Sequence, residues 1–153
     1  MIVIVSDLNI LKQCGTPIPM ASCCISAGFP SPADNYIEQR IDFNDLLIQN
    51  PSATFLVKVE GDSMIYSFIP PNALLVVDKS LMPKNGSIVV ACVNNEFTVK
   101  KFYSSGEGMF LFPSNPRYDV IQLDEGMDFK VWGVVTKIII DPKDVDDDCL
   151  GRL

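Results

Sequence analysis

Ser63 and Lys100 are two residues whose side chains could together break a peptide bond. A serine hydroxyl is a weak nucleophile until a neighbouring base removes its proton. Histidine is the common base, and this sequence of 153 residues contains none. A lysine can replace it when burial lowers the lysine pKa from roughly 10.4 towards neutrality and leaves a free amine. The pair is therefore a candidate nucleophile and general base.

The local pattern alone does not select Lys100 over its neighbour Lys101. Both lie in a stretch that alternates like a β-strand, and adjacent strand residues point to opposite faces. Lys100 shares its face with Thr98, whereas Lys101 shares the other face with Val99. Ser63 stands in Gly61-Asp62-Ser63-Met64, and a serine beside glycine and aspartate is typical of a turn.

The composition favours one globular domain and argues against a direct DNA-binding protein and against a membrane-spanning protein. Hydrophobic residues make up 48% of the chain, and the net charge is −7. An acidic chain without a basic stripe is a poor direct ligand for DNA, because phosphate neutralisation supplies most non-specific affinity. No apolar run approaches the roughly 18 residues of a membrane span, and the first residues lack the basic start of a signal peptide.

The five cysteines indicate a reduced, cytoplasmic chain with free thiols. Their number is odd, Cys23 and Cys24 are adjacent, and no Cys-x-x-Cys occurs. Zinc sites need such spacing or histidines, so we expect neither a metal nor another cofactor.

Three regions are expected along the chain. Residues 1–27 are interrupted by proline and glycine and predict a mobile arm, although an apolar strand is expected at Ile2–Val5. Residues 28–140 contain the alternating segments of a compact domain. Residues 141–153 are rich in aspartate and predict a disordered acidic tail.

The domain is expected to be mostly β, with short helices near its start. Asp42 can cap a helix over Phe43–Gln49, and an earlier short helix is expected after Ser31, with Pro32 at its first position. Asn94-Asn95 suits a two-residue hairpin turn, because asparagine tolerates positive φ. The predicted strands lie around residues 55–59, 74–77, 88–93, 97–102, 109–112, 120–123 and 129–140.

Several segments resemble the LexA/UmuD family of self-cleaving Ser-Lys peptidases, which includes the UmuD accessory subunit of DNA polymerase V. The resemblance runs from Gly28 to about Ile140. It is carried by the following segments: Gly28-Phe29-Pro30-Ser31-Pro32, Tyr36-Ile37-Glu38-Gln39-Arg40-Ile41-Asp42, Gly61-Asp62-Ser63-Met64-Ile65, Leu74-Leu75-Val76-Val77-Asp78 and Glu96-Phe97-Thr98-Val99-Lys100-Lys101. Many relatives have Gly-Asp at Asn72-Ala73, so the loop over Tyr66–Ala73 departs from the family pattern.

The resemblance implies a compact, multi-stranded peptidase domain preceded by an extended arm. It implies that Ser63 is the nucleophile, Lys100 the general base and Ala27-Gly28 the bond that the protein cuts in itself. It further implies an SOS-response protein of translesion synthesis. Its expected partners are a second copy, a RecA filament on single-stranded DNA, the polymerase subunit UmuC and the replicative sliding clamp.

Three other functions fit parts of the sequence. A LexA-like transcription regulator would need a DNA-binding domain, which 27 proline-rich residues cannot supply. A signal peptidase also pairs serine with a distant lysine, but it needs a membrane anchor. A non-cleaving binding module of the same fold stays open, because Ser63 and Lys100 could both be present and yet misplaced.

Overall fold

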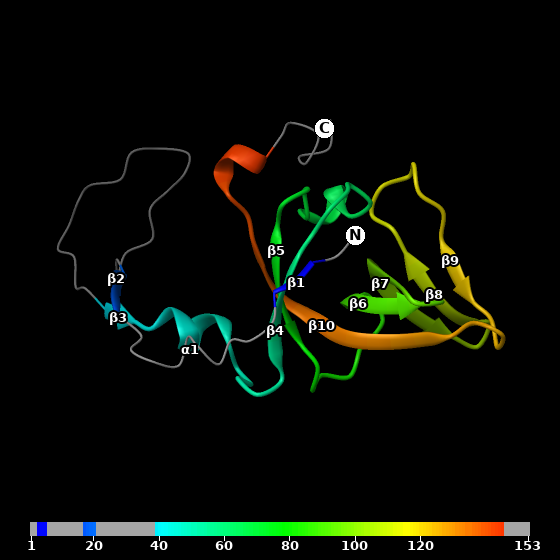
Figure 1. Cartoon of the computed structure of the whole chain (residues 1–153), viewed down its shortest axis with the longest axis horizontal. Coiled ribbons are helices and arrows are strands. Elements are labelled where there is room, and N and C mark those ends of the chain that lie inside the picture. Colours follow the sequence, from blue (N-terminus) through cyan, green and yellow to red (C-terminus); the bar gives the residue numbers. More distant parts are fainter. Residues whose placement is uncertain (1–2, 6–16, 21–38, 146–153) are drawn as a thin grey trace. The chain divides into compact units, whose positions relative to one another are not determined.

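The chain divides into two compact units in the computed structural model, which describes residues 3–5, 17–20 and 39–145 (Figure 1). One unit combines Met1–Leu8 with Asn50–Leu153, and the other is Asn9–Gln49. Strands predominate in the larger unit, so the expected mostly-β fold is confirmed. The predicted cleavage bond and the helix predicted after Ser31 lie outside the described residues.

The described residues of the smaller unit form a two-stranded antiparallel sheet and one short helix. Its strands are β2 (Ile18–Met20) and β3 (Gln39–Ile41). Helix α1 (Phe43–Leu47) begins as predicted, because the side chain of Asp42 accepts a hydrogen bond of 2.8 Å from the Asn44 N–H. The predicted end at Gln49 is wrong by two residues, since Ile48 already has extended backbone angles.

The larger unit is built on a sheet in which eight strands are described, all paired antiparallel. Their order across the sheet is β1-β4-β5-β10-β6-β7-β8-β9. The strands are β1 (Val3–Val5), β4 (Thr54–Lys58), β5 (Leu74–Asp78), β6 (Ile88–Val93), β7 (Glu96–Ser105), β8 (Gly108–Phe112), β9 (Ile121–Leu123) and β10 (Phe129–Ile139).

The hairpin between β6 and β7 confirms the turn predicted at Asn94-Asn95. Both asparagines have positive φ, 50° and 66°, as a two-residue turn of this kind requires. The turn fixes the register in which Val89 lies opposite Lys100. The placement of Lys100 on the sheet therefore follows from local turn chemistry.

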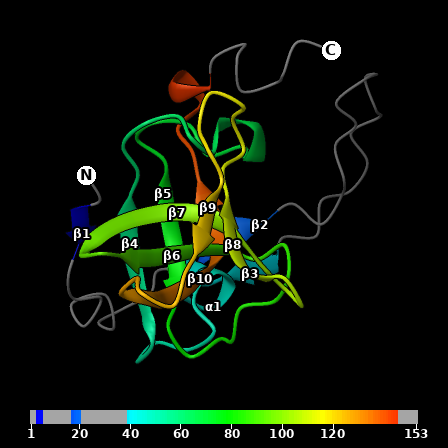
Figure 2. The same cartoon turned by 90° about the vertical axis from the view of Figure 1, so that its right-hand side faces the viewer.

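Strand β10 lies in the middle of the sheet and carries an irregularity towards each neighbour. Its register shifts between Val131 and Gly133 against β6, and between Val135 and Lys137 against β5. Extra residues of this kind increase twist and bend a strand. Figures 1 and 2 show that β4 and β5 run across the direction of β6 and β7, with β10 bending to pair with both sets.

The buried side chains form two groups, and β6 and β7 contribute to both. The first group contains Val57, Met64 and Leu75 among its members, and Trp132 packs against it. The second is smaller and contains Phe102 and Leu111. Lys100 sits on β7, which contributes side chains to both groups.

The start of the predicted acidic tail is ordered as a 3₁₀ helix, η3 (Pro142–Asp144), capped by the side chain of Asp141. The rest of that tail, residues 146–153, lies outside the described residues. Among the described helices, none has the length and apolar character needed to cross a membrane.

Gly133 allows the close approach of β10 to β5, and its substitution should destabilise the sheet. A Cβ added there would lie 2.7 Å from Val77 Cγ1 and 2.9 Å from the carbonyl oxygen of Asp78. We expect Gly133→Ala to lower the free energy of unfolding by about 1–3 kcal/mol. Urea unfolding followed by the fluorescence of Trp132, the single tryptophan, measures it.

Gly126→Ala is the matched control, because an added Cβ there meets no atom within 4 Å. Equal stabilities of the two variants would contradict the role given to Gly133.

Candidate active site

Ser63 lies in a tight turn that follows β4 and leads into the 3₁₀ helix η2 (Ile65–Ser67). Gly61 has a φ of +87°, which glycine adopts without steric cost. The turn is anchored on both sides of the helix, because the side chains of Met64 and Ile69 are almost completely buried in the first core group. Ser63 itself is half-buried. The turn that carries the Ser63 hydroxyl is therefore rigid.

The loop that departs from the family pattern keeps an ordered backbone. Asn72 has a φ of 71°, a left-handed conformation that asparagine adopts more readily than most residues. Its N–H donates to the carbonyl of Val59 at 2.9 Å, and the Val59 N–H donates to Ala73 at 3.0 Å. Phe68 also has a positive φ, 58°, which is unusual for an aromatic residue.

The amine of Lys100 lies against the hydroxyl of Ser63. Lys100 Nζ is 3.0 Å from Ser63 Oγ, 2.9 Å from Thr98 Oγ1 and 3.1 Å from the carbonyl oxygen of Val99. Only 7% of the Lys100 surface is exposed. The three protons of the ammonium form thus have one acceptor each.

Burial lowers the pKa of Lys100 below its ordinary value of 10.5. The cause is desolvation, which disfavours the charged form. An uncharged amine has two N–H donors and one lone pair. If Thr98 Oγ1 and the Val99 carbonyl accept the two N–H groups, the lone pair points at the Ser63 hydroxyl. The arrangement therefore suits a base that accepts the serine proton.

Within the described part of the chain, two backbone N–H groups beside the hydroxyl are available to an oxygen ligand. The N–H groups of Ile65 and the four following residues donate hydrogen bonds within the turn or to Ser114. Those of Ser63 and Met64 bind no acceptor among the described residues. Paired N–H groups next to a nucleophile can bind the oxyanion of a tetrahedral intermediate.

The structure brings together Ser63 and Lys100 and separates Lys101 from them. Lys101 points to the opposite face of β7 and is half-buried. Ala27 and Gly28 lie outside the described residues. Thr98 was not predicted as a site residue, although the period-two pattern had placed it on the same face as Lys100.

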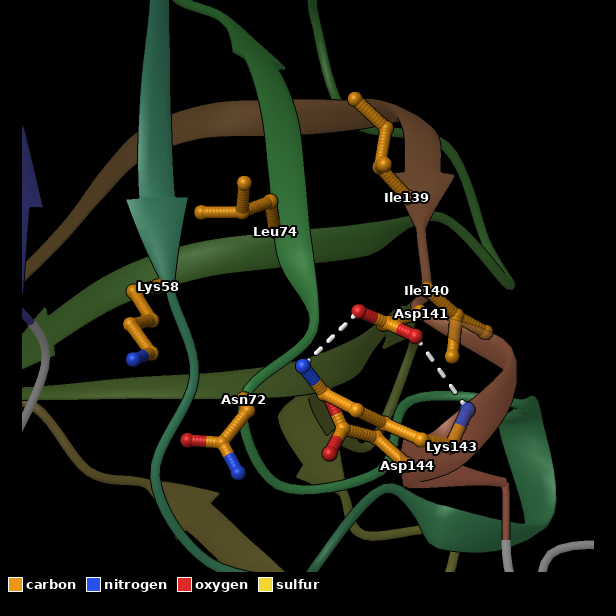
Figure 3. Close-up of a pocket in the computed structure, with 8 residues that line it drawn as sticks. All are labelled: Lys58, Asn72, Leu74, Ile139, Ile140, Asp141, Lys143 and Asp144. Atoms are coloured by element: carbon orange, nitrogen blue, oxygen red, sulfur yellow. Dashed lines mark hydrogen bonds and ion pairs between the residues drawn. The ribbon is translucent and has the colours of Figure 1, made fainter.

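A separate cavity of about 680 Å³ opens where β4 and β10 end and β5 begins (Figure 3). Lys143 Nζ and Asp141 form an ion pair of 3.0 Å on its wall. Its lining residues are Lys58, Asn72, Leu74, Ile139, Ile140, Asp141, Lys143 and Asp144. Neither Ser63 nor Lys100 lines it, so the cavity is distinct from the site that these two residues form. Within the described parts of the chain, no three potential metal ligands cluster.

Comparison with known proteins relates the chain to a family of peptidases. The sequence profile described as "Peptidase S24-like" matches residues 19–136. Protein MucA of Salmonella typhimurium is 42% identical over 125 residues, which cover 81% of this chain and 85% of MucA. Protein SamA of the same species is 40% identical over 78% of this chain and 83% of SamA. The LexA repressor of Shewanella piezotolerans is 39% identical over 65% of this chain and 48% of LexA.

The lowered pKa of Lys100 predicts a specific pH dependence of stability. Between the folded-state pKa and 10.5, the unfolded chain binds a proton at Lys100 that the folded chain does not. Stability therefore rises with pH through this window. Lys100→Met removes the titration, so the unfolding free energy of the wild type should increase relative to this variant as the pH rises towards 10.5. Urea unfolding of both proteins across the window measures it, and parallel curves would contradict the burial of a titrating amine.

Proposed function

Because the chain belongs to the Peptidase S24-like family, we propose that it is a serine peptidase that cleaves its own Ala27–Gly28 bond with Ser63 and Lys100. Membership confirms the resemblance to the LexA/UmuD family seen in the sequence motifs. The observation that supports the catalytic assignment most strongly is the 3.0 Å contact between Lys100 Nζ and Ser63 Oγ.

The proposed reaction begins with an uncharged Lys100. Its amine takes the Ser63 proton while Ser63 Oγ forms a bond to the carbonyl carbon of Ala27. The tetrahedral intermediate collapses, the Ala27–Gly28 bond breaks, and the Lys100 ammonium gives its proton to the departing Gly28 amine. Water then hydrolyses the Ser63 ester, with Lys100 again acting as the base. Residues 1–27 are released as one product.

Two backbone N–H groups and the Thr98 hydroxyl would assist this chemistry, and the residues at the cleaved bond suit it. The N–H groups of Ser63 and Met64 would bind the oxyanion, because no other acceptor in the described structure occupies them. Thr98 would keep the amine directed at Ser63 through its 2.9 Å hydrogen bond. A small residue such as Ala27 before a glycine suits a bond that must approach a half-buried hydroxyl.

The proposed biological role is that of an SOS-response accessory protein of translesion synthesis. Its likeness to MucA and SamA over about four-fifths of the chain supports a role of the UmuD kind. In this role a RecA filament on single-stranded DNA stimulates cleavage, and the shortened homodimer acts with UmuC in DNA polymerase V. The replicative sliding clamp is a further proposed partner.

The proposed function is tested by incubating the purified full chain at about pH 9, where more of a buried lysine is uncharged, and measuring intact masses over time. We expect a single new cut, with the large product beginning at Gly28. Ser63→Ala and Lys100→Ala should abolish it, since each removes one half of the proton transfer. Lys101→Ala should retain cleavage, because its side chain occupies the other face of β7.

A product that begins elsewhere, or cleavage that survives Ser63→Ala, would contradict the assignment. Loss of cleavage in Lys101→Ala but not in Lys100→Ala would reverse the choice of base. Circular dichroism of each variant checks that it is folded.

A further inference from the structure

The segment that follows β8 is hydrogen-bonded directly to the turn that carries Ser63. The Ser114 N–H donates to the carbonyl of Ser63 at 2.8 Å, and the Tyr66 N–H donates to the carbonyl of Ser114 at 3.0 Å. The hydroxyls of Ser67 and Ser114 are 2.6 Å apart. This segment, residues 113–118, is called the strap here.

The strap connects the turn to the strand that carries the base. Strand β8 pairs with β7, and Phe112 at its end lies opposite Lys101. The strap begins at the next residue, so it continues directly from the strand that pairs with β7. The strap thus joins the Ser63 turn to the neighbour of the strand that carries Lys100.

Asp62, which directly precedes Ser63, is held by two side chains of the strap. Asn115 Nδ2 donates to the carbonyl of Asp62 at 3.0 Å and to its carboxylate at 3.2 Å. The Tyr118 hydroxyl donates to the other carboxylate oxygen. Asn115 is only 3% exposed, although it lies in a connection between strands. Both the backbone and the side chain of Asp62 are therefore fixed.

The sequence of the strap fixes its shape before it contacts the turn. Pro113 and Pro116 each fix one backbone angle. The Asn115 side chain accepts from the Arg117 N–H at 3.1 Å, and the Tyr118 N–H donates to the Asn115 carbonyl at 3.1 Å. These bonds define a turn with proline at its second position, a favoured arrangement.

We infer that Asn115 and Tyr118 are positioning residues, which hold Asp62 so that the Ser63 hydroxyl stays within reach of the Lys100 amine. The inference rests on the proposed function. The Lys100 amine makes its hydrogen bonds with Ser63, Thr98 and Val99 and with neither of these residues, so both act through the turn. Ser63 has no strand of its own to hold it, and a displacement of about 1 Å at a reacting group can reduce a rate by about 100-fold.

Asp62 and Tyr118 each shift the pKa of the other in the direction that favours their hydrogen bond. The hydrogen bond from Tyr118 is the main cause that lowers the pKa of Asp62, and exposed Arg117, 3.8 Å away, adds to it. The same hydrogen bond raises the pKa of Tyr118 above its ordinary value of 10.0. Both shifts favour the protonated tyrosine and the ionised carboxylate, which are the forms that make this hydrogen bond.

Tyr118→Phe tests the inference, because it removes one hydroxyl and keeps the ring. We expect the self-cleavage rate to fall at least about tenfold at every pH, with the midpoint of its pH profile unchanged, since Lys100 keeps its surroundings. Tyr103→Phe is the matched control: its exposure is 38% against 42% for Tyr118, and its ring packs on Phe112. The control should cleave at the wild-type rate.

A double variant shows whether Tyr118 acts through Asp62. If it does, Asp62→Asn combined with Tyr118→Phe should cleave no more slowly than Asp62→Asn alone. Equal rates for Tyr118→Phe and Tyr103→Phe would overturn the inference. So would a rate loss in Tyr118→Phe that merely follows a loss of thermal stability.

A second measurement separates failure of the inference from failure of the proposed function. A fluorophosphonate probe reacts with an activated serine without any cleavage of the chain. Slower labelling of Ser63 in Tyr118→Phe than in Tyr103→Phe supports the positioning role. If the wild type neither cleaves itself nor reacts with the probe, the proposed function is contradicted. If the wild type does both, and Tyr118→Phe cleaves and reacts at the same rates, only the inference is contradicted.

Discussion

The hydrogen bond between the buried Lys100 amine and the Ser63 hydroxyl is the interaction on which the rest of the account depends. Burying an amine among apolar side chains is costly while it is charged. The protein reduces that cost with two further acceptors, Thr98 Oγ1 and the Val99 carbonyl. If they accept the two N–H groups of the uncharged amine, its lone pair points at Ser63. Burial thus lowers the pKa of the amine, while the two acceptors fix its orientation.

The fold supplies the two halves of this pair from different structural elements. Lys100 comes from β7, whose neighbours on both sides fix its register. Ser63 comes from a turn that is anchored in the core by Met64 and Ile69. The same turn is hydrogen-bonded to Ser114. Each hydrogen bond of this kind contributes modestly to stability, about 1 kcal/mol. Their larger effect is to confine a flexible turn to one position.

Local chemistry allowed much of the sheet to be predicted, and tertiary contacts set the rest. The Asn94-Asn95 turn and the Asp42 cap depend on neighbours in sequence, so both were predicted correctly. The choice between Lys100 and Lys101 could not be made from periodicity, because both faces of β7 contribute buried side chains. The hydrogen bonds of Asn115 to Asp62 join segments far apart in sequence, and no local sequence pattern predicts them.

The pH dependence of the unassisted self-cleavage rate tests the central claim most directly. If uncharged Lys100 is the base, the rate constant should be small near pH 7 and rise with pH, about tenfold per pH unit, until it levels off near the folded-state pKa of Lys100. That pKa can be measured independently by NMR of the lysine Nζ, and the two midpoints should coincide. A rate that stays flat from about pH 6 to pH 10 would show that no such lysine titrates, and would contradict the account.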